Sequence, residues 1–222
     1  MTDRTEHIVQ SRRAQRRDGL ATRQELLEAA GKVFAERGFR DATSKEICAL
    51  AGANSAAVNY HFGGKEGLYE EVLVEAHKQM LSLEDLSAII DADVAPEEKL
   101  RAFLGRLIRT AAAAAELWGI RVFLRELAAP THLVNKAMST AIFPKAAKMR
   151  LLIHEITGLP PDSPRAQRAV AFMVLPCISL IVFPENLRTK ILPATAISED
   201  ALLEDLFRYV TGGLRALGDG GV

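Results

Sequence analysis

The sequence has little cysteine: Cys48 and Cys177 are the only two among 222 residues, far apart, with no CxxC pair or Cys/His cluster. It therefore has neither the disulfide framework of a small secreted domain nor the cysteine spacing of a zinc site. We expect both thiols to be reduced in an intracellular protein. Cys48 fits a small buried residue, and the alternative is a redox switch.

Net charge is absent as well. Lysine and arginine together number 28, and aspartate and glutamate also number 28. The chain is therefore not a bulk polycation, and any contact with nucleic acid has to come from a local basic patch.

The motifs of common enzymes and metal sites are also missing. No HExxH or GxSxG occurs, and the five histidines show no i, i+3 or i+4 pairing. Gly64-Lys65 superficially resembles a phosphate loop, but Glu66 stands where Ser or Thr is needed and the upstream glycine is missing. We expect no catalytic residue, no metal site and no cofactor.

We expect neither a signal peptide nor a membrane-spanning helix. The N-terminus is charged rather than apolar, unlike a secretory signal peptide. The longest apolar run, residues 169–183, contains Pro176 and falls short of the roughly 20 residues of a spanning helix. We expect a soluble, cytoplasmic protein with no membrane partner.

Residues 43–65 carry the strongest pattern in the chain. Thr43 and Glu46 form a capping box, which predicts the start of a helix. Gly52 is placed to end that helix, and Asn54 is a good N-cap for a second helix over residues 55–62. Two short helices joined by a glycine-containing turn describe a helix-turn-helix. The apolar side of the first helix is expected at Ile47, Leu50 and Ala51.

The second helix of this pair is unusually rich in small and polar residues. Val58 and Phe62 are its expected buried side. A helix that enters a DNA major groove needs small residues for close approach and polar groups for base edges. The exposed side is expected to present Ser55, Ala56, Ala57 and Asn59.

These residues resemble the TetR family of bacterial transcriptional regulators. The matching positions cover about the first third of the chain, in order. Asn59 and Gly64 depart from it, since Tyr and Ser are usual there. The residues that carry the resemblance are Thr22, Ala30, Phe34, Gly38, Phe39, Thr43, Ile47, Ala51, Gly52, Tyr60, Phe62, Lys65, Glu66 and Leu68.

The resemblance implies double-stranded DNA as a partner, read as an inverted repeat. Lysines suit phosphates as point charges, and Tyr and His can donate to phosphate oxygens. Asn59 could read an adenine edge or make a further phosphate contact, while Ala56 and Ala57 could touch thymine methyls. The implied DNA-binding residues are Thr43, Lys45, Ser55, Ala56, Ala57, Asn59, Tyr60, His61 and Lys65.

The sequence divides into four segments. Residues 1–20 are expected to be a flexible basic arm, either frayed in solvent or reaching phosphates and the minor groove. Residues 21–66 are expected to form the DNA-binding domain, with a first helix over 22–37 that Thr22 and Glu25 begin and Gly38 ends. Residues 67–217 are expected to form an effector-binding and dimerisation domain, and residues 218–222 a frayed tail.

The body reads as helical throughout, so the fold class is all-α: a three-helix head and a helical body for ligand binding and dimerisation. Residues 82–96 are predicted to be a helix end followed by a loop, and 184–193 a loop. Short strings in the body, FLRELAAPT and ITGLPPDSP, are similar to the CecR-type subgroup of the family. In the family the last two long helices form a homodimer, here residues 164–183 and 198–217. The alternative is that both complete a monomer core.

A small-molecule effector is the second implied partner. Arg121 and Arg125 lie one helical turn apart and could form surface ion pairs or act as polar anchors of a pocket. Aromatic residues at helical spacing can equally be plain core. The candidate pocket residues are Phe103, Leu107, Trp118, Arg121, Phe123, Met138 and Phe172.

Two functions from different classes are compatible with these patterns. The first is a dimeric DNA-binding repressor whose DNA affinity a small molecule lowers. The second is a helical small-molecule-binding or catalytic protein whose head serves assembly only. The small-residue helix flanked by Tyr60, His61 and Lys65 favours the first, because an enzyme has no need for it.

Overall fold

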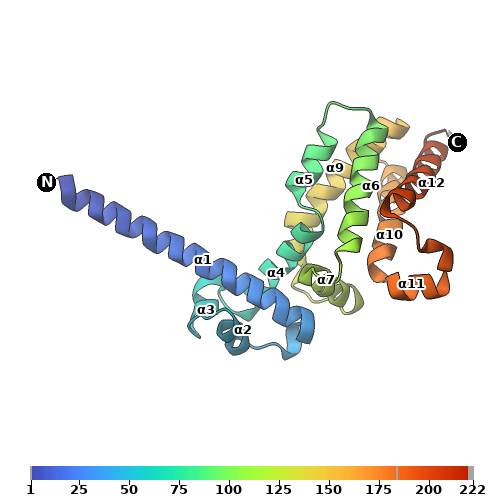
Figure 1. The fold of residues 1–222 in the computed structure, drawn as a ribbon. Coiled ribbons are helices and arrows are strands. Elements are labelled where there is room, and N and C mark those ends of the chain that lie inside the picture. The colour runs from blue at the N-terminus through green and yellow to red at the C-terminus, as the bar shows by residue number, and fades with distance from the viewer. Residues whose placement is uncertain (1, 184, 220–222) are drawn as a thin grey trace.

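The computed structural model describes the backbone of residues 2–183 and 185–219, and the side chains of residues 19–183 and 186–218. Within these ranges every regular element is helical, which confirms the all-α prediction. The chain folds into a small head at its N-terminal end and a larger helical body (Figure 1).

The head is built on α1, Thr2–Asp41, followed by α2, Ser44–Leu50, and α3, Ala57–Phe62. The predicted start of the first helix at Thr22 is wrong, because α1 continues back to Thr2 through residues with good helix propensity. The predicted break at Gly38 is confirmed: its φ of 75° and ψ of 173° interrupt the helix. The side chains of the predicted basic arm lie outside the described residues up to position 18.

The helix-turn-helix forms at the predicted place with one shift in its bounds. Thr43 accepts a hydrogen bond from the Glu46 N–H at 3.2 Å and so caps α2. The second helix begins at Ala57 rather than at residue 55, because Asn54 Oδ1 accepts the Ala56 N–H at 2.9 Å and holds that segment in a turn. Leu50 is 57 % exposed, so its predicted place on the apolar side of α2 is wrong.

The body begins with α4, which starts beside α3 and continues into the rest of the molecule. Two predicted loops contain helices. Ser82 caps α5 through the Asp85 N–H at 2.9 Å, and the acidic residues that follow favour a helix start rather than a break. The body elements are α4 Lys65–Met80, α5 Leu83–Ile90, α6 Pro96–Ala112, α7 Trp118–Ala128, α8 Val134–Ala137, a π-helical turn Met138–Ile142, α9 Phe143–Thr157, α10 Pro164–Val182, α11 Glu185–Ile191, a 3-10 turn Pro193–Thr195 and α12 Glu199–Asp219.

The body helix α10 contains nearly all of the longest apolar run of the chain. By length and composition alone its 19 residues suffice to cross a membrane, a test that the core helix of a soluble protein also passes. Only 28 % of that stretch is buried within the single chain. Its outer side carries Phe172, 55 % exposed, and Leu175, 56 % exposed.

Two hydrophobic cores divide the described chain near the end of α4. The first core joins α1–α4 with α7 and α8, and α7 lies between the head and the remaining helices (Figure 1). The second core joins α5, α6, α9, α10 and α12. Representative members are Leu26, Phe34, Ile47, Val58, Leu68 and Trp118 in the first, and Leu86, Leu100, Leu104, Leu152, Met173 and Leu214 in the second.

Candidate DNA interface and ligand cavity

The helix-turn-helix presents most of the predicted DNA-binding residues to solvent. Tyr60 is 84 % exposed, and its ring meets that of His61 edge-on with 4.9 Å between centroids. Ala57, His61 and Lys65 are half-buried. The exposed members of the set are Thr43, Lys45, Ser55, Ala56, Asn59 and Tyr60.

Lys65 is engaged within the head itself. Its Nζ donates to the Ala42 carbonyl at 2.8 Å and to the Arg40 carbonyl at 3.3 Å, and lies 4.7 Å from the centroid of the Phe39 ring. These carbonyls lie at the end of α1 and just after it, where backbone acceptors need donors from outside the helix. Lys65 therefore fixes the start of α4 against the end of α1, whatever it contacts beyond the chain.

Contacts that the sequence analysis missed orient α3 against its scaffold. The Arg23 guanidinium pairs with Glu71 at 3.0 Å and lies 4.8 Å from the centroid of the Phe62 ring. A Cβ at Gly67 would lie 2.1 Å from the Phe62 carbonyl oxygen, so α4 approaches the end of α3 as closely as a glycine permits. The exposed side of α3 is thereby held in one direction.

The α7 helix attaches to the head through two of the residues that the sequence placed elsewhere. Trp118 is buried in the first core, and its Nε1 donates to Glu28 of α1 at 2.9 Å. Arg125 donates from Nε to the Ala35 carbonyl at 2.9 Å and from Nη2 to that of Glu36. Among the described residues Arg125 therefore contacts backbone carbonyls of α1 instead of an acidic partner or the pocket, and the break at Gly38 leaves those carbonyls in need of donors.

The buried carboxylate of Glu126 also helps to attach α7 to its neighbours. Tyr69 of α4 donates to Glu126 Oε2 at 2.9 Å, and the other carboxylate oxygen accepts from both the N–H and the hydroxyl of Thr131. Burial, and then the charge of Glu126, raise the pKa of the Tyr69 hydroxyl far above its usual value. The phenol therefore stays protonated and keeps donating.

A cavity of about 420 Å³ lies in the body beneath α10, against α4, α6, α7 and α9. Three of the candidate pocket residues line it: Phe103, Leu107 and Phe123. Met138 lines a neighbouring cavity of about 210 Å³ that shares Phe123 and His77 with the first. The placement of the other three candidates in this pocket is wrong: Trp118 belongs to the first core, Arg121 is exposed, and Phe172 lies on an outer groove beside Tyr209.

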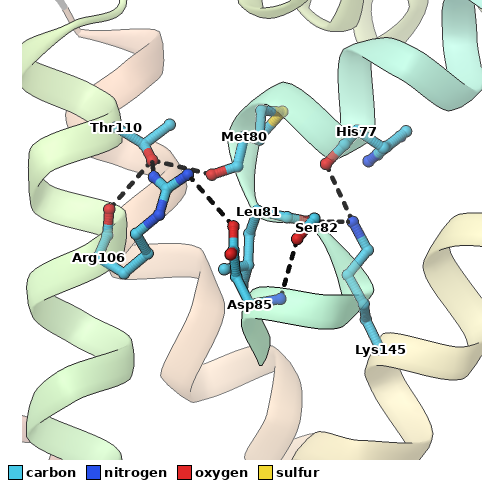
Figure 2. Close-up of polar contacts among 8 residues, drawn as sticks. All are labelled: His77, Met80, Leu81, Ser82, Asp85, Arg106, Thr110 and Lys145. Atoms are coloured by element: carbon cyan, nitrogen blue, oxygen red, sulfur yellow. Dashed lines mark hydrogen bonds and ion pairs between the residues drawn. The ribbon is translucent and has the colours of Figure 1, made fainter. Parts of the chain in front are cut away.

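Polar residues gather where α4 ends, at one side of this cavity (Figure 2). Lys145 extends from α9 and donates to the Leu81 carbonyl at 2.8 Å and to the His77 carbonyl at 3.1 Å. From the other side, Thr110 of α6 donates to the Met80 carbonyl at 2.9 Å and accepts from Arg106. Two neighbouring helices thus satisfy the last carbonyls of α4.

Burial in this region shifts two pKa values downward. The pKa of His77 falls to about 4, through burial first and then the nearby charge of Lys145. Burial alone lowers the pKa of Lys145 to about 8. Lys145 was not among the predicted pocket residues, although Ile142 and Met149, three residues before and four after it, place it on the apolar side of α9.

The fold and its exposed helix-turn-helix define a DNA-binding regulator with a helical regulatory body, and comparisons with known proteins agree. Residues 26–72 match the family described as bacterial regulatory proteins, tetR family. Residues 96–214, more than half of the chain, match the C-terminal domain of the HTH-type transcriptional dual regulator CecR. The chain therefore belongs to the TetR family of transcriptional regulators and carries a CecR-type C-terminal domain. This family consists of regulators and not of enzymes, which confirms the prediction that the chain is not an enzyme.

Individual relatives show where the similarity is concentrated. The HTH-type transcriptional repressor NicS of Pseudomonas putida is 38 % identical over 90 residues, 40 % of each chain. KstR2 of Rhodococcus jostii, also a repressor, is 43 % identical over 51 residues, and the match covers 25 % of its length. The chain thus spans less than half the length of either relative.

Solved structures extend the similarity in fold to nearly the whole chain. The fatty acid degradation regulator FadR from Bacillus halodurans superposes with a TM-score of 0.65 at 18 % identity, over 86 % of this chain and 99 % of that one. FadR from Bacillus subtilis, in complex with stearoyl-CoA, gives a TM-score of 0.64 at 15 % identity, over 86 % and 98 %. At these identities the likeness concerns the fold alone.

Proposed function

We propose that this regulator is a cytoplasmic repressor that binds an inverted-repeat operator as a homodimer and leaves it when a small molecule enters the body. The observation that carries the proposal is the pairing of two features in one chain. An exposed helix-turn-helix lies on a packed scaffold, and the body contains an apolar cavity at the far end of α4, the helix that begins beside α3. The relatives NicS and KstR2, which are named repressors, support the direction of control.

The proposed DNA contacts follow from the exposed side chains of α2 and α3. Lys45 binds a phosphate, Tyr60 and His61 donate to phosphate oxygens, and Asn59 faces the base edges. Ala56, Ala57 and Ser55 allow close approach, and Thr43 adds a contact from the start of α2. Lys65 has three N–H donors, and the two that hold α1 leave one for a phosphate. Residues 1–20 act as an arm beside this surface.

The proposed dimer uses α10 and α12, within an effector-binding and dimerisation domain of residues 67–217. A soluble monomer rarely leaves large contiguous apolar surface in water. Besides Phe172 and Leu175, the C-terminal part of the body exposes Phe183 and Tyr209, the latter at 71 %. A symmetric pair would set two α3 helices about 34–36 Å apart, one turn of DNA.

The proposed effector site is the body cavity. Its volume lies within the range of roughly 300–1,000 Å³ that small-molecule sites occupy. The complex of Bacillus subtilis FadR with stearoyl-CoA is a precedent for a ligand in a protein of this fold. The ligand regulates only if it binds the DNA-free arrangement of heads more tightly than the DNA-bound one.

Sedimentation and DNA titration test this function together. The full chain is titrated against a duplex carrying an inverted repeat from the DNA next to its own gene, and against a scrambled duplex of equal composition. We expect a dimer at micromolar concentration that prefers the repeat by at least about 10³-fold. A monomer, or equal affinity for both duplexes, would contradict the proposal.

A further inference from the structure

One cation lies in an otherwise apolar cavity. Among the described residues that line it, the polar side chains are those of His77, Lys145 and Gln167. His77 is neutral at pH 7 because burial lowers its pKa to about 4, and Gln167 is exposed at the outer side of α10. Lys145 is therefore the charged group of the lining.

The charge of Lys145 is bonded but not neutralised. Its Nζ has the carbonyls of His77 and Leu81 as acceptors, and no carboxylate is its partner in the described part of the chain. Neutral carbonyls satisfy N–H donors, but a desolvated cation is stabilised much more by an opposite charge. A carboxylate that enters from the cavity would supply the opposite charge that the two carbonyls lack.

Apolar side chains surround the rest of this space. Phe103 and Leu107 of α6 form one wall, and Met149 of α9 another. On the outer side the lining includes Ala171 and Leu175 of α10, which are exposed. The site thus offers one polar end and a long apolar surface, which suits an amphipathic molecule.

We propose that this cavity binds a medium-sized apolar carboxylic acid, with its carboxylate on Lys145 Nζ and its hydrocarbon body along Phe103, Leu107 and Met149. This assignment rests on the proposed function, since it names the chemical class of the effector. The cavity volume of about 420 Å³ lies in the lower part of the usual range, which favours a short body over a long chain.

The position of Lys145 also connects this ligand to the head. The carboxylate competes for Nζ with the two carbonyls of the last turn of α4. Thr110 keeps its own bond to the Met80 carbonyl, so the ligand removes one of two attachments of that helix end. Because α4 begins at Lys65, beside α3, a change at its far end alters how the head is held.

Calorimetric titration of the full chain with three probes of equal chain length tests the ligand class. The probes are decanoate, 1-decanol and decyltrimethylammonium, all kept below their aggregation concentrations. We expect decanoate to bind at least about tenfold more tightly than decanol, and the cation more weakly than either. Equal affinities of decanoate and decanol for the wild-type chain would overturn the proposal.

Variants then locate the carboxylate. Lys145→Met and Lys145→Gln should both lose the preference for decanoate over decanol, and Lys145→Arg should keep it. The glutamine amide can still donate to a carbonyl, so this second neutral variant remains informative if the methionine variant unfolds. The matched control is Lys148→Met, on the same helix, because Lys148 pairs with Asp91 at 2.6 Å outside the lining. Unchanged discrimination in folded Lys145→Gln would assign the carboxylate to another group.

The two proposals fail separately. A chain that binds decanoate through Lys145 but does not prefer any operator would refute the proposed function and leave the ligand class standing. A chain that prefers its operator, yet does not distinguish decanoate from decanol, would refute the ligand class alone. Release of the operator duplex by decanoate and not by decanol would support both.

Discussion

The indole of Trp118 lies directly against Gly31 of α1, so closely that a Cβ at position 31 would come within 2.4 Å of its ring atoms Cδ2 and Cε2. This contact, with the hydrogen bond from the same indole to Glu28, makes α7 part of the scaffold that carries α2 and α3. The head is therefore packed against α7 as well as against α4.

Replacing Gly31 with alanine tests this contact. Overpacking a close interface costs about 1–3 kcal/mol, so we expect Gly31→Ala to lower the free energy of unfolding by that amount. Urea unfolding followed by tryptophan fluorescence reports on it directly, because Trp118 is the sole tryptophan of the chain. Gly19→Ala is the control in the same helix: nothing lies within 4 Å of a Cβ there, so stability should be unchanged or slightly increased. A neutral Gly31→Ala would contradict the packing.

Protonation of His77 should make folding depend on pH in the acid range. Its pKa is about 4 in the folded chain and about 6.5 when unfolded, so between these values the unfolded state binds the extra proton and stability falls as pH falls. From pH 7 to pH 5 the loss is about 2 kcal/mol.

Denaturant unfolding at both pH values, for wild type and His77→Gln, measures this dependence. We expect the glutamine variant to lose less stability on acidification than the wild type. His132→Gln, at an exposed position, should behave as the wild type does. The same acid loss in His77→Gln would assign the effect to other groups.

Two lysines at the head surface should both contribute to DNA binding, but only one of them should contribute to stability. Lys45 is exposed, so Lys45→Ala should weaken binding to every duplex and reduce the salt dependence by about one phosphate, with unfolding unchanged. Lys65→Ala should do the same to DNA binding but also destabilise the head, because Ala42 and Arg40 lose a donor to their carbonyls. Affinity at two salt concentrations and urea unfolding are measured for both. Unaltered stability of Lys65→Ala would show that its bonds within the head contribute nothing.

Asn59 is expected to carry sequence preference. If its amide reads a base edge, Asn59→Ala should cost about 1–3 kcal/mol on the operator and relax the choice at one base pair. Titration against the operator, its single-base variants and scrambled DNA makes the distinction. An equal loss on all duplexes would assign Asn59 to a phosphate instead.

The sequence was sufficient where a structure depends on near neighbours. The Thr43 cap joins residues three positions apart, and the break at Gly38 depends on the backbone angles of a single glycine. Such signals are readable because helix ends need a specific donor, acceptor or backbone angle at a fixed offset. The helix-turn-helix follows from them.

The pocket is formed by residues that lie far apart along the chain, and several of its predicted members were wrong. Trp118 looks the same in sequence whether it lines a cavity or packs on a glycine of α1, since both uses place an aromatic residue at helical spacing. Phe172 was assigned inward, yet only one side of α10 faces the core. Lys145 was overlooked because its acceptors lie 64 and 68 residues away along the chain.

The membership of α7 and α8 in the first core has a consequence for the order in which this chain can fold. Residues up to Ala76 supply most of that core, but Trp118, Val122, Leu133 and Ala137 complete it. As the chain leaves the ribosome from its N-terminus, the head can collapse early but cannot close until the segment through Ala137 has emerged. Residues 118–137 can contact the head only after a long stretch of chain has closed into a loop, and loop closure of this kind slows folding. The helix-turn-helix thus gains its final rigidity only after about half of the second core has also been synthesised.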